Sequence, residues 1–370
     1  MSTPLHGAHF PSTNPILEVK TPHRLHNLTN PSVPFSSSQI HLLSLSHAMD
    51  LQLEQLQSLS SVDVLRESAE IPRAAPRTFS LLTLALVFPL SFAILVHSLF
   101  THPVLLHLEQ SSSSPYSSSG WSLLFFYQFI YIIFLFIFSL LSTAAIVFTV
   151  ASLYAAKPVS FTSSLSAIPP IFPRLFRTFL WVSLLMFLYN LAFAFSLVML
   201  LVAYPSSDSP FFLIVLSLLI AAFIAVHVLI SALWHLASVV SVLEPICGLE
   251  AMRKARQLLR GRARMAAILI TGYLSACGLI GWAFRAFVVK GPTEEGSFGL
   301  GVPAKVLVGG GLVAVLVLIN FVGLLAQSVF YYVCKSYHHQ TIDKSALYDH
   351  LGGYLGEYVP LKSSIQMENI

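Results

Sequence analysis

The sequence predicts an all-α polytopic membrane protein, in which six transmembrane helices form a bundle and amphipathic elbow helices lie at the membrane interface. Six long apolar stretches lie between Thr78 and Val333. Hydrophobic residues make up 55% of the 370 residues and charged residues only 10%, whereas ordinary soluble domains are roughly 25% charged. The loops between the stretches alternate between basic and almost uncharged, which is the pattern of a multi-pass membrane protein.

Residues 1–48 have a composition that cannot bury a hydrophobic core. They are rich in Ser, Thr, Pro, His and Asn, and Glu18 is their only acidic residue. We therefore expect a disordered N-terminal extension. Three interpretations are open: an inert tail, a plastid-type transit peptide, which is hydroxylated and poor in acidic residues, or sequence upstream of a translation start at Met49.

Residues 49–77 are expected to form cytosolic interfacial helices that lead into the first span. Ser60 and Asp63 have the spacing of a capping box. The helix that follows has one apolar stripe: Val62, Leu65 and Ala69. Such a stripe fits a helix lying on the membrane interface, and it equally fits a soluble helix docked on the cytosolic ends of the bundle.

The first span is predicted at residues 78–100, where neighbouring helices can satisfy the carbonyl that Pro89 frees. The second, at residues 121–154, contains no charged residue, Gly or Pro, and we expect one continuous helix. The remaining spans are also long enough to cross a bilayer. They are predicted at residues 178–203, 211–243, 265–289 and 306–333.

The distribution of Lys and Arg predicts the orientation. The N-terminal segment carries five of them, the loop between spans 2 and 3 three, the loop between spans 4 and 5 six, and the tail at residues 335–370 three. The opposite side carries three: Arg285, Lys290 and Lys305. By the positive-inside rule both termini lie in the cytosol or its topological equivalent.

The loop between spans 4 and 5 contains the clearest amphipathic segment, at residues 248–260. Its apolar residues share one arc of a helix: Ala251, Met252, Ala255, Leu258 and Leu259. Its basic residues are candidates for binding anionic lipid headgroups on the cytosolic leaflet: Arg253, Lys254, Arg256 and Arg260. The alternative is that these charges only keep the loop on the cytosolic side.

Two further patterns concern the connections. Spans 2 and 3 and spans 4 and 5 show a faint internal repeat, in which a long helix ends before Pro158 or Pro245 and a basic segment leads into the returning span.

In the tail at residues 335–370, Tyr348, Tyr354 and Tyr358 alternate with glycines. This suits a compact cap folded against the cytosolic helix ends.

Polar groups within membrane spans are candidates for function. Four are singled out: Asn190, His227, Glu244 and Asn320. For the two asparagines the structural alternative is a hydrogen bond between helices. For Glu244, which ends the fourth span, it is an ion pair with an arginine of the basic loop. A metal or haem pair formed by His227 and His235 is not expected, because their spacing places them on different faces of a helix.

Three runs of sequence resemble a family of uncharacterised plant multi-pass transmembrane proteins, from about Met49 to the C-terminus. They are Ile71-Pro72-Arg73 through Phe88-Pro89-Leu90-Ser91-Phe92 to Ser98-Leu99-Phe100; Ser238-Val239-Val240-Ser241-Val242-Leu243-Glu244 through Gly248 to Arg260-Gly261-Arg262; and His350-Leu351-Gly352-Gly353-Tyr354-Leu355-Gly356-Glu357-Tyr358-Val359-Pro360-Leu361. The second run is also distantly similar to the membrane domain found beside bacterial glycerophosphodiester phosphodiesterases. The resemblance implies a fold and no chemistry.

No catalytic, nucleotide-binding or cofactor motif is present in the sequence. We expect a non-enzymatic membrane protein without a cofactor, acting in membrane organisation or trafficking in the endoplasmic reticulum or another endomembrane. Its expected partner is the lipid bilayer, with anionic headgroups, and not nucleic acid. The alternatives are a small-solute transporter or channel for the function and the plastid envelope for the location.

Overall fold

The structure is a computed structural model that describes residues 59–110, 117–204, 210–290, 301–338, 340 and 344–355. All of them belong to one compact unit, Leu42–Ile370. Across these ranges the chain is helical and forms no strand, so the predicted all-α class is confirmed. The predicted disordered extension at residues 1–48 and the end of the tail, residues 356–370, lie outside the described part.

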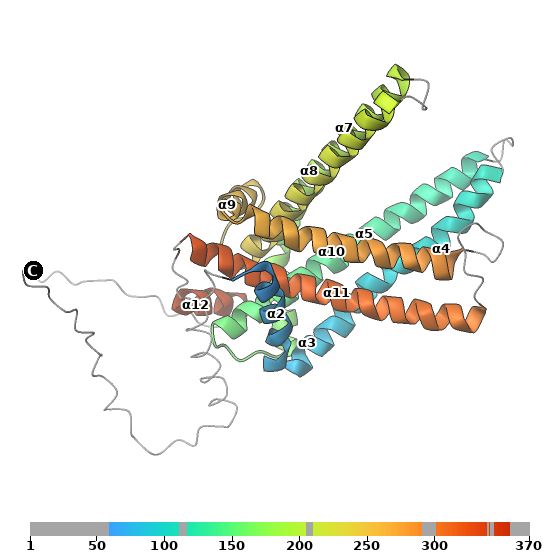
Figure 1. Cartoon of the computed structure of the whole chain (residues 1–370). Helices are drawn as coiled ribbons and strands as arrows, with labels where there is room; N and C mark the ends of the chain where they lie inside the picture. The colour runs from blue at the N-terminus through green and yellow to red at the C-terminus, as the bar shows by residue number, and fades with distance from the viewer. Residues whose placement is uncertain are drawn as a thin grey trace, which may run out of the picture. The chain divides into compact units, whose positions relative to one another are not determined.

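Six helices in the described ranges are long and apolar enough to cross a membrane, as predicted (Figure 1). The first span combines α3 (Pro76–Leu82), the π-helical turn η3 (Thr83–Val87) and α4 (Phe88–Gln110). The others are α5 (Ser117–Tyr154), α7 (Ile168–Ala203), α8 (Pro210–Leu243), α10 (Ala263–Phe284) continued by the π-helical turn η4 (Arg285–Val289), and α11 (Val302–Tyr337).

Prolines account for the largest differences from the predicted boundaries. The third span was expected to begin at Thr178, but α7 begins at Ile168, has Pro169 and Pro170 in its first turn and contains Pro173 inside the helix. Proline is tolerated in the first turn of a helix, because the N–H that it lacks has no partner there. In the first span Pro89 does not break the helix. The turn before it widens instead, and the Phe88 N–H bonds to the carbonyl of Thr83.

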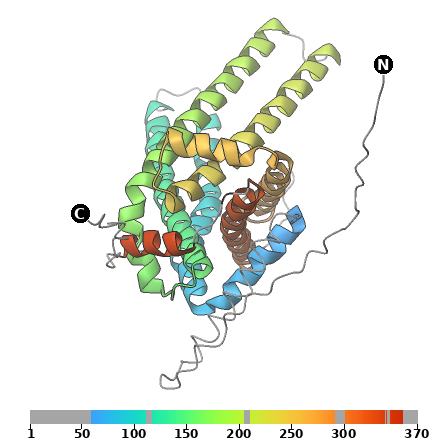
Figure 2. The ribbon, with the colours of Figure 1, turned by 90° about the vertical axis from the view of Figure 1, so that its left-hand side faces the viewer.

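Shorter helices gather at one end of the bundle, which we call the elbow end. It contains the C-terminal ends of α5, α8 and α11 (Figure 2). The short helices are α2 (Ser61–Glu70), η2 (Ile71–Ala74), α6 (Phe161–Ser166), α9 (Leu249–Leu259) and α12 (Lys344–Tyr354). Both connections of the predicted repeat therefore contain a short helix, α6 in the first and α9 in the second.

The hydrophobic core is concentrated at the elbow end. There α5 is buried almost continuously from Leu140 to Tyr154, and α8 from Leu236 to Leu243. Many of the buried side chains are small, such as Ala144, Ala145 and Ala237, which allows helix backbones to approach closely. The spans therefore bury most of their shared surface at this end.

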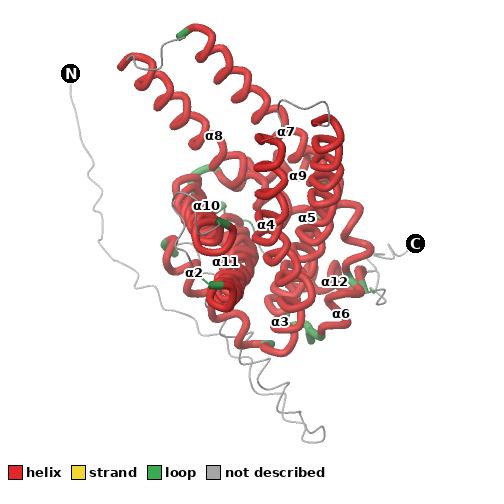
Figure 3. Tube along the Cα trace, turned by 90° about the vertical axis from the view of Figure 1, so that its right-hand side faces the viewer, coloured by secondary structure: helices red, strands yellow, loops and turns green. Residues whose placement is uncertain are grey.

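Away from the elbow end, α7 and α8 project beyond the other helices as a pair (Figures 1 and 3). The two helices contact each other there, with the rings of Tyr189 and Phe223 stacked at 4.8 Å between centroids. Large apolar side chains such as Phe187 and Leu218 are exposed on the outside of the pair. In a bilayer these surfaces face lipid.

The helix α2 begins with the predicted capping box. The Ser60 hydroxyl accepts a hydrogen bond from the Asp63 N–H, and the Asp63 carboxylate accepts one from the Ser60 N–H. The hydrogen bond from the Ser60 side chain holds the pKa of Asp63 below its ordinary value. Val64 and Ser68 bury one face of α2 against the bundle, and the stripe of Val62 and Leu65 stays exposed.

Candidate functional site

Helix α9 combines a buried apolar face with an exposed basic face. Ala251 and Ala255 are fully buried, and Leu258 is 1% exposed, because this face packs against the end of α8. Arg253, Arg256 and Arg260 are exposed on the other side, and Lys254 is half-buried. The predicted amphipathic helix is therefore present, but its apolar face is covered by protein and not by the lipid leaflet.

Two glycines fix the position of α9. Gly248, directly before the helix, has φ +63° and donates its N–H to the Thr178 hydroxyl over 2.8 Å. Gly261, two residues after its end, has φ +85°, and a Cβ there would lie 2.5 Å from the Tyr337 ring. The left-handed backbone favours glycine at both positions. The guanidinium of Arg262 then lies over the Tyr337 ring, 4.7 Å from its centroid.

Glu244 is the centre of a second cluster, at the end of α8. Its Oε1 accepts a hydrogen bond of 2.7 Å from the Tyr331 hydroxyl, and Lys335 Nζ lies 3.7 Å from the same oxygen. We expected Glu244 to pair with an arginine of the basic loop, and this expectation was wrong. The arginines of α9 lie on its outer face, whereas α11 brings Tyr331 and Lys335 directly to the carboxylate.

The carbonyl groups at the C-terminal end of α8 are satisfied from other elements. Arg174 of α7 donates to the Glu244 carbonyl over 2.7 Å, and Tyr354 of α12 donates to the Val242 carbonyl over 3.0 Å. Arg174 also donates to the Tyr354 hydroxyl over 2.7 Å. The last carbonyls of a helix lack partners within the helix and favour a nearby cation, so these bonds fasten α12 to the bundle.

In the described part of the tail, α12 packs against the bundle as a cap, and its Leu351 is fully buried. His350 Nε2 lies 3.0 Å from the Tyr354 hydroxyl. Burial, together with the nearby Arg174 charge, lowers the pKa of His350, and the Glu244 charge opposes this effect. Burial raises the pKa of Tyr354, which keeps its hydroxyl protonated and able to donate. Tyr358 lies outside the described residues.

The predicted intramembrane polar residues do not form one site. Asn320 bridges three helices, since its Nδ2 donates to Ser91 of α4 over 2.8 Å and its Oδ1 accepts from Tyr273 of α10 over 2.9 Å. Asn190 only donates to the Met186 carbonyl of its own helix. His227 stacks near Tyr189 and Phe223 on the projecting pair. The structural alternative is thus confirmed for Asn320, whereas in the described part of the chain Asn190 bonds only within its own helix.

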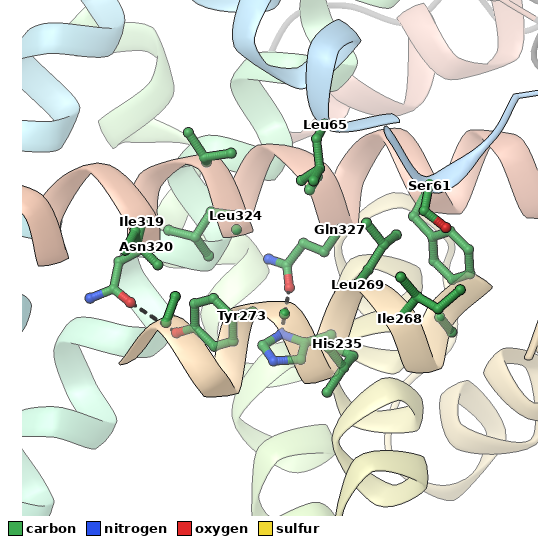
Figure 4. A pocket seen from close by; sticks show the side chains of 18 of the residues that line it. Ser61, Leu65, His235, Ile268, Leu269, Tyr273, Ile319, Asn320, Leu324 and Gln327 are labelled. Atoms are coloured by element: carbon green, nitrogen blue, oxygen red, sulfur yellow. Dashed lines mark hydrogen bonds between the residues drawn. The ribbon is translucent and has the colours of Figure 1, made fainter. Parts of the chain in front are cut away.

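A cavity between α2, α8, α10 and α11 contains polar groups that sequence reasoning did not bring together (Figure 4). Asn320 and Tyr273 lie at one side, and His235 and Gln327 meet at the other, with 2.8 Å between His235 Nδ1 and Gln327 Oε1. The cavity wall is otherwise mainly apolar. Tyr273 was missed because a tyrosine within a span is ordinarily a packing residue, and no spacing pattern joins it to Asn320.

Between α4 and α5, His97 Nε2 lies 2.9 Å from Gln128 Oε1, and the His97 ring stacks on Tyr131 at 3.8 Å between centroids. These contacts join α4 to α5. Among the described residues, no group of three His, Cys, Asp or Glu is placed to hold a metal ion.

Comparison with curated proteins and with solved structures gave no match. A family model matches most of the chain, residues 49–370. The match begins at Met49, where the composition of the sequence changes. This six-span helical chain, with its basic elbow and its capped end, therefore belongs to the family described as Domain of unknown function (DUF8558).

Proposed function

We propose that this protein acts without catalysis in the organisation or trafficking of endomembranes, through the basic face of α9 on its cytosolic surface. The observation that carries the proposal is the division of α9 into two faces. On one face Ala251, Ala255, Leu258 and Leu259 are already buried in the protein, and on the other face Arg253, Arg256 and Arg260 are exposed. The helix therefore presents fixed positive charges instead of inserting into the leaflet.

The proposed ligand of this face is an anionic lipid headgroup. Each Lys or Arg near a membrane surface contributes about 1 kcal/mol to the attraction of anionic lipid. The orientation with both termini in the cytosol is part of the proposal, and the charge count of the loops supports it. The resemblance to plant multi-pass proteins remains a prediction.

The alternative of a small-solute transporter or channel has less support. It relied on a polar cavity lined by Asn190, His227 and Asn320. Of these, only Asn320 lines the cavity between α8, α10 and α11, whose wall is mainly apolar. Asn190 and His227 belong to the projecting α7 and α8 pair.

The proposal can be tested with the full chain in nanodiscs of neutral phosphatidylcholine. Short-chain phosphatidylserine should bind more tightly than short-chain phosphatidylcholine, and added salt should weaken binding because the attraction is screened. Replacing Arg253→Gln and Arg260→Gln together should weaken phosphatidylserine binding by about 2 kcal/mol.

A matched control removes two positive charges elsewhere, by Arg66→Gln and Arg285→Gln, and should leave this affinity unchanged. Equal binding of both lipids, or an equal loss of phosphatidylserine affinity in the control, would contradict the proposed binding. The basic face would then serve only to orient the loop in the membrane.

An internal tag on the full chain should locate it in the endoplasmic reticulum or another endomembrane. A location in the plastid envelope would contradict the proposed compartment.

A further inference from the structure

The cavity between α2, α8, α10 and α11 has a volume of about 540 Å³. This lies within the range of small-molecule sites, roughly 300 to 1,000 Å³. Asp, Glu, Lys and Arg are all absent from its described lining. A charged ligand group would therefore meet no counter-charge there, which is costly in a site surrounded by hydrocarbon.

The rim of the cavity is apolar and exposed. At its rim Val62, Ile268 and Leu318 are 72%, 62% and 60% exposed. Ile268 and Leu318 belong to the membrane-spanning helices α10 and α11, and Val62 belongs to α2, which lies over the cavity (Figure 4). A ligand that is itself dissolved in the bilayer can enter beside Ile268 and Leu318 of the two spans without crossing water.

The inner wall contains one polar group that the protein leaves unsatisfied. Gln327 is 8% exposed, and its carboxamide meets His235 at 2.8 Å. The other end of the carboxamide, Nε2, has no hydrogen-bond partner among the described residues. The side chains of Asn320 and Tyr273, in contrast, have hydrogen-bond partners: they bond to each other, and Asn320 also bonds to Ser91.

The chemistry of this pair selects a hydroxyl group. His235 can bond either end of the carboxamide, depending on its tautomer and on the rotation of the amide. The end of the carboxamide that does not bond to His235 is then either the NH₂ group, a donor, or the carbonyl oxygen, an acceptor. A hydroxyl both donates and accepts, so it complements Gln327 in either case, whereas a buried amide without a partner is costly.

We infer that this cavity binds a neutral, membrane-dissolved lipid whose hydroxyl group hydrogen-bonds to Gln327 and whose apolar body fills the space between α2, α10 and α11. A sterol and a diacylglycerol both have this chemistry. The inference is independent of the basic face on α9, since that face is exposed and attracts charged headgroups.

Photoactivatable, alkyne-tagged lipids can test the site with the full chain in phosphatidylcholine nanodiscs. Three probes are used: a sterol, a diacylglycerol and a phosphatidylserine. We expect at least one neutral probe to attach to α2, α10 and α11 peptides around the cavity, and the untagged lipid to compete. The probe that attaches identifies the lipid class. Attachment of neither neutral probe, or equal attachment of phosphatidylserine at these peptides, would overturn the inference.

Two variants separate cavity binding from general contact with lipid. Gly272 lines the cavity, and a Cβ there would meet nothing within 4 Å, so Gly272→Phe can be accommodated at its Cβ and places a large side chain at the cavity wall. Gly278 on the same helix is equally open but lies outside the cavity. Labelling should be lost in Gly272→Phe and kept in Gly278→Phe. Equal labelling of the two variants, or an equal loss in both, would contradict the site.

The role of the carboxamide is tested by Gln327→Met, which keeps the length of the side chain and removes the hydrogen bond. The neutral lipid should bind about fivefold more weakly, as expected for the loss of one hydrogen bond. Unchanged affinity would overturn the proposed contact between the hydroxyl and the carboxamide. If Gln327→Met does not fold, the comparison of Gly272→Phe with Gly278→Phe still decides whether the cavity is occupied.

Discussion

Asn320 and Asn190 show how differently one residue type can act within a membrane span. Asn320 is 6% exposed and joins α11 to α4 and α10 through Ser91 and Tyr273. Asn190 is exposed, and its amide bonds to a carbonyl one turn earlier in its own helix. Both residues satisfy the rule that polar groups in lipid need a partner, but only Asn320 contributes to the packing of the bundle.

We predict that Asn320→Leu destabilises the protein, because it breaks both bonds between helices and leaves Ser91 and Tyr273 to find other partners. Such bonds contribute up to about 1.7 kcal/mol each in membranes, and on average about 0.6 kcal/mol. A loss of about 1 kcal/mol should appear as a lower midpoint in thermal unfolding of the full chain in detergent. The matched change Asn190→Leu should leave the midpoint unchanged, and an equal effect would contradict the bridging role of Asn320.

Among the elements, α9 shows what an amphipathic pattern predicts and what it leaves open. The pattern gave the helix and its two faces correctly, but it could not tell whether lipid or protein covers the apolar face. The small side chains Ala251 and Ala255 were the available signal. Small residues allow close contact between helices, whereas helices that insert into a leaflet carry bulky Trp, Phe or Leu.

The docking of α12 should weaken on acidification. The pKa of His350 is lowered in the docked state, mainly by burial and then by Arg174 of α7, with Glu244 opposing. When α12 is released, the imidazole titrates near pH 6.5. The released state therefore binds a proton that the docked state does not, and docking is lost as the pH falls below about 6.5.

Hydrogen exchange of the α12 amides in the full chain can measure this effect, with faster exchange expected at pH 5.5 than at pH 7.5 after correction for the intrinsic rate. The variant His350→Gln should remove the pH dependence. Tyr354→Phe, which loses the bonds to Arg174 and to the Val242 carbonyl, should speed exchange at both pH values. Persistent pH dependence in His350→Gln would assign the effect to another group.

For the molecule as a whole, local patterns predicted the six spans and their order. Each span is a continuous run of apolar residues long enough to cross the bilayer, and such a run can be recognised without knowing any distant contact. They could not predict contacts between distant segments. Glu244 meets Lys335 of another helix, and Gln327 meets His235, because the packing of α8 against α11 brings them together. The predicted start at Thr178 followed Arg177, the last charged residue before the apolar stretch, and so it missed the earlier turns of α7.

The proposed orientation predicts which loops face the lumen. Glycosylation acceptor sites introduced into the serine-rich segment at residues 111–119 and into the loop at residues 291–300 should be modified in microsomes. Sites in the loop at residues 244–262 or in the tail should not be modified, because the positive charges there hold them in the cytosol. A spacer makes the short first loop accessible to the enzyme. The reverse pattern would contradict cytosolic termini.

The lengths of the spans imply that this chain folds in two solvents. Helices α5, α7 and α11 contain 38, 36 and 36 residues, or roughly 54 to 57 Å at 1.5 Å per residue. The hydrocarbon of a bilayer is about 30 Å thick, and even a tilt of about 40° leaves more than about 10 Å of each helix outside it. The elbow end is the part where these helices bury one another beneath α2, α6, α9 and α12. Water therefore drives the assembly of that end, as in a soluble helical domain, while lipid surrounds the rest.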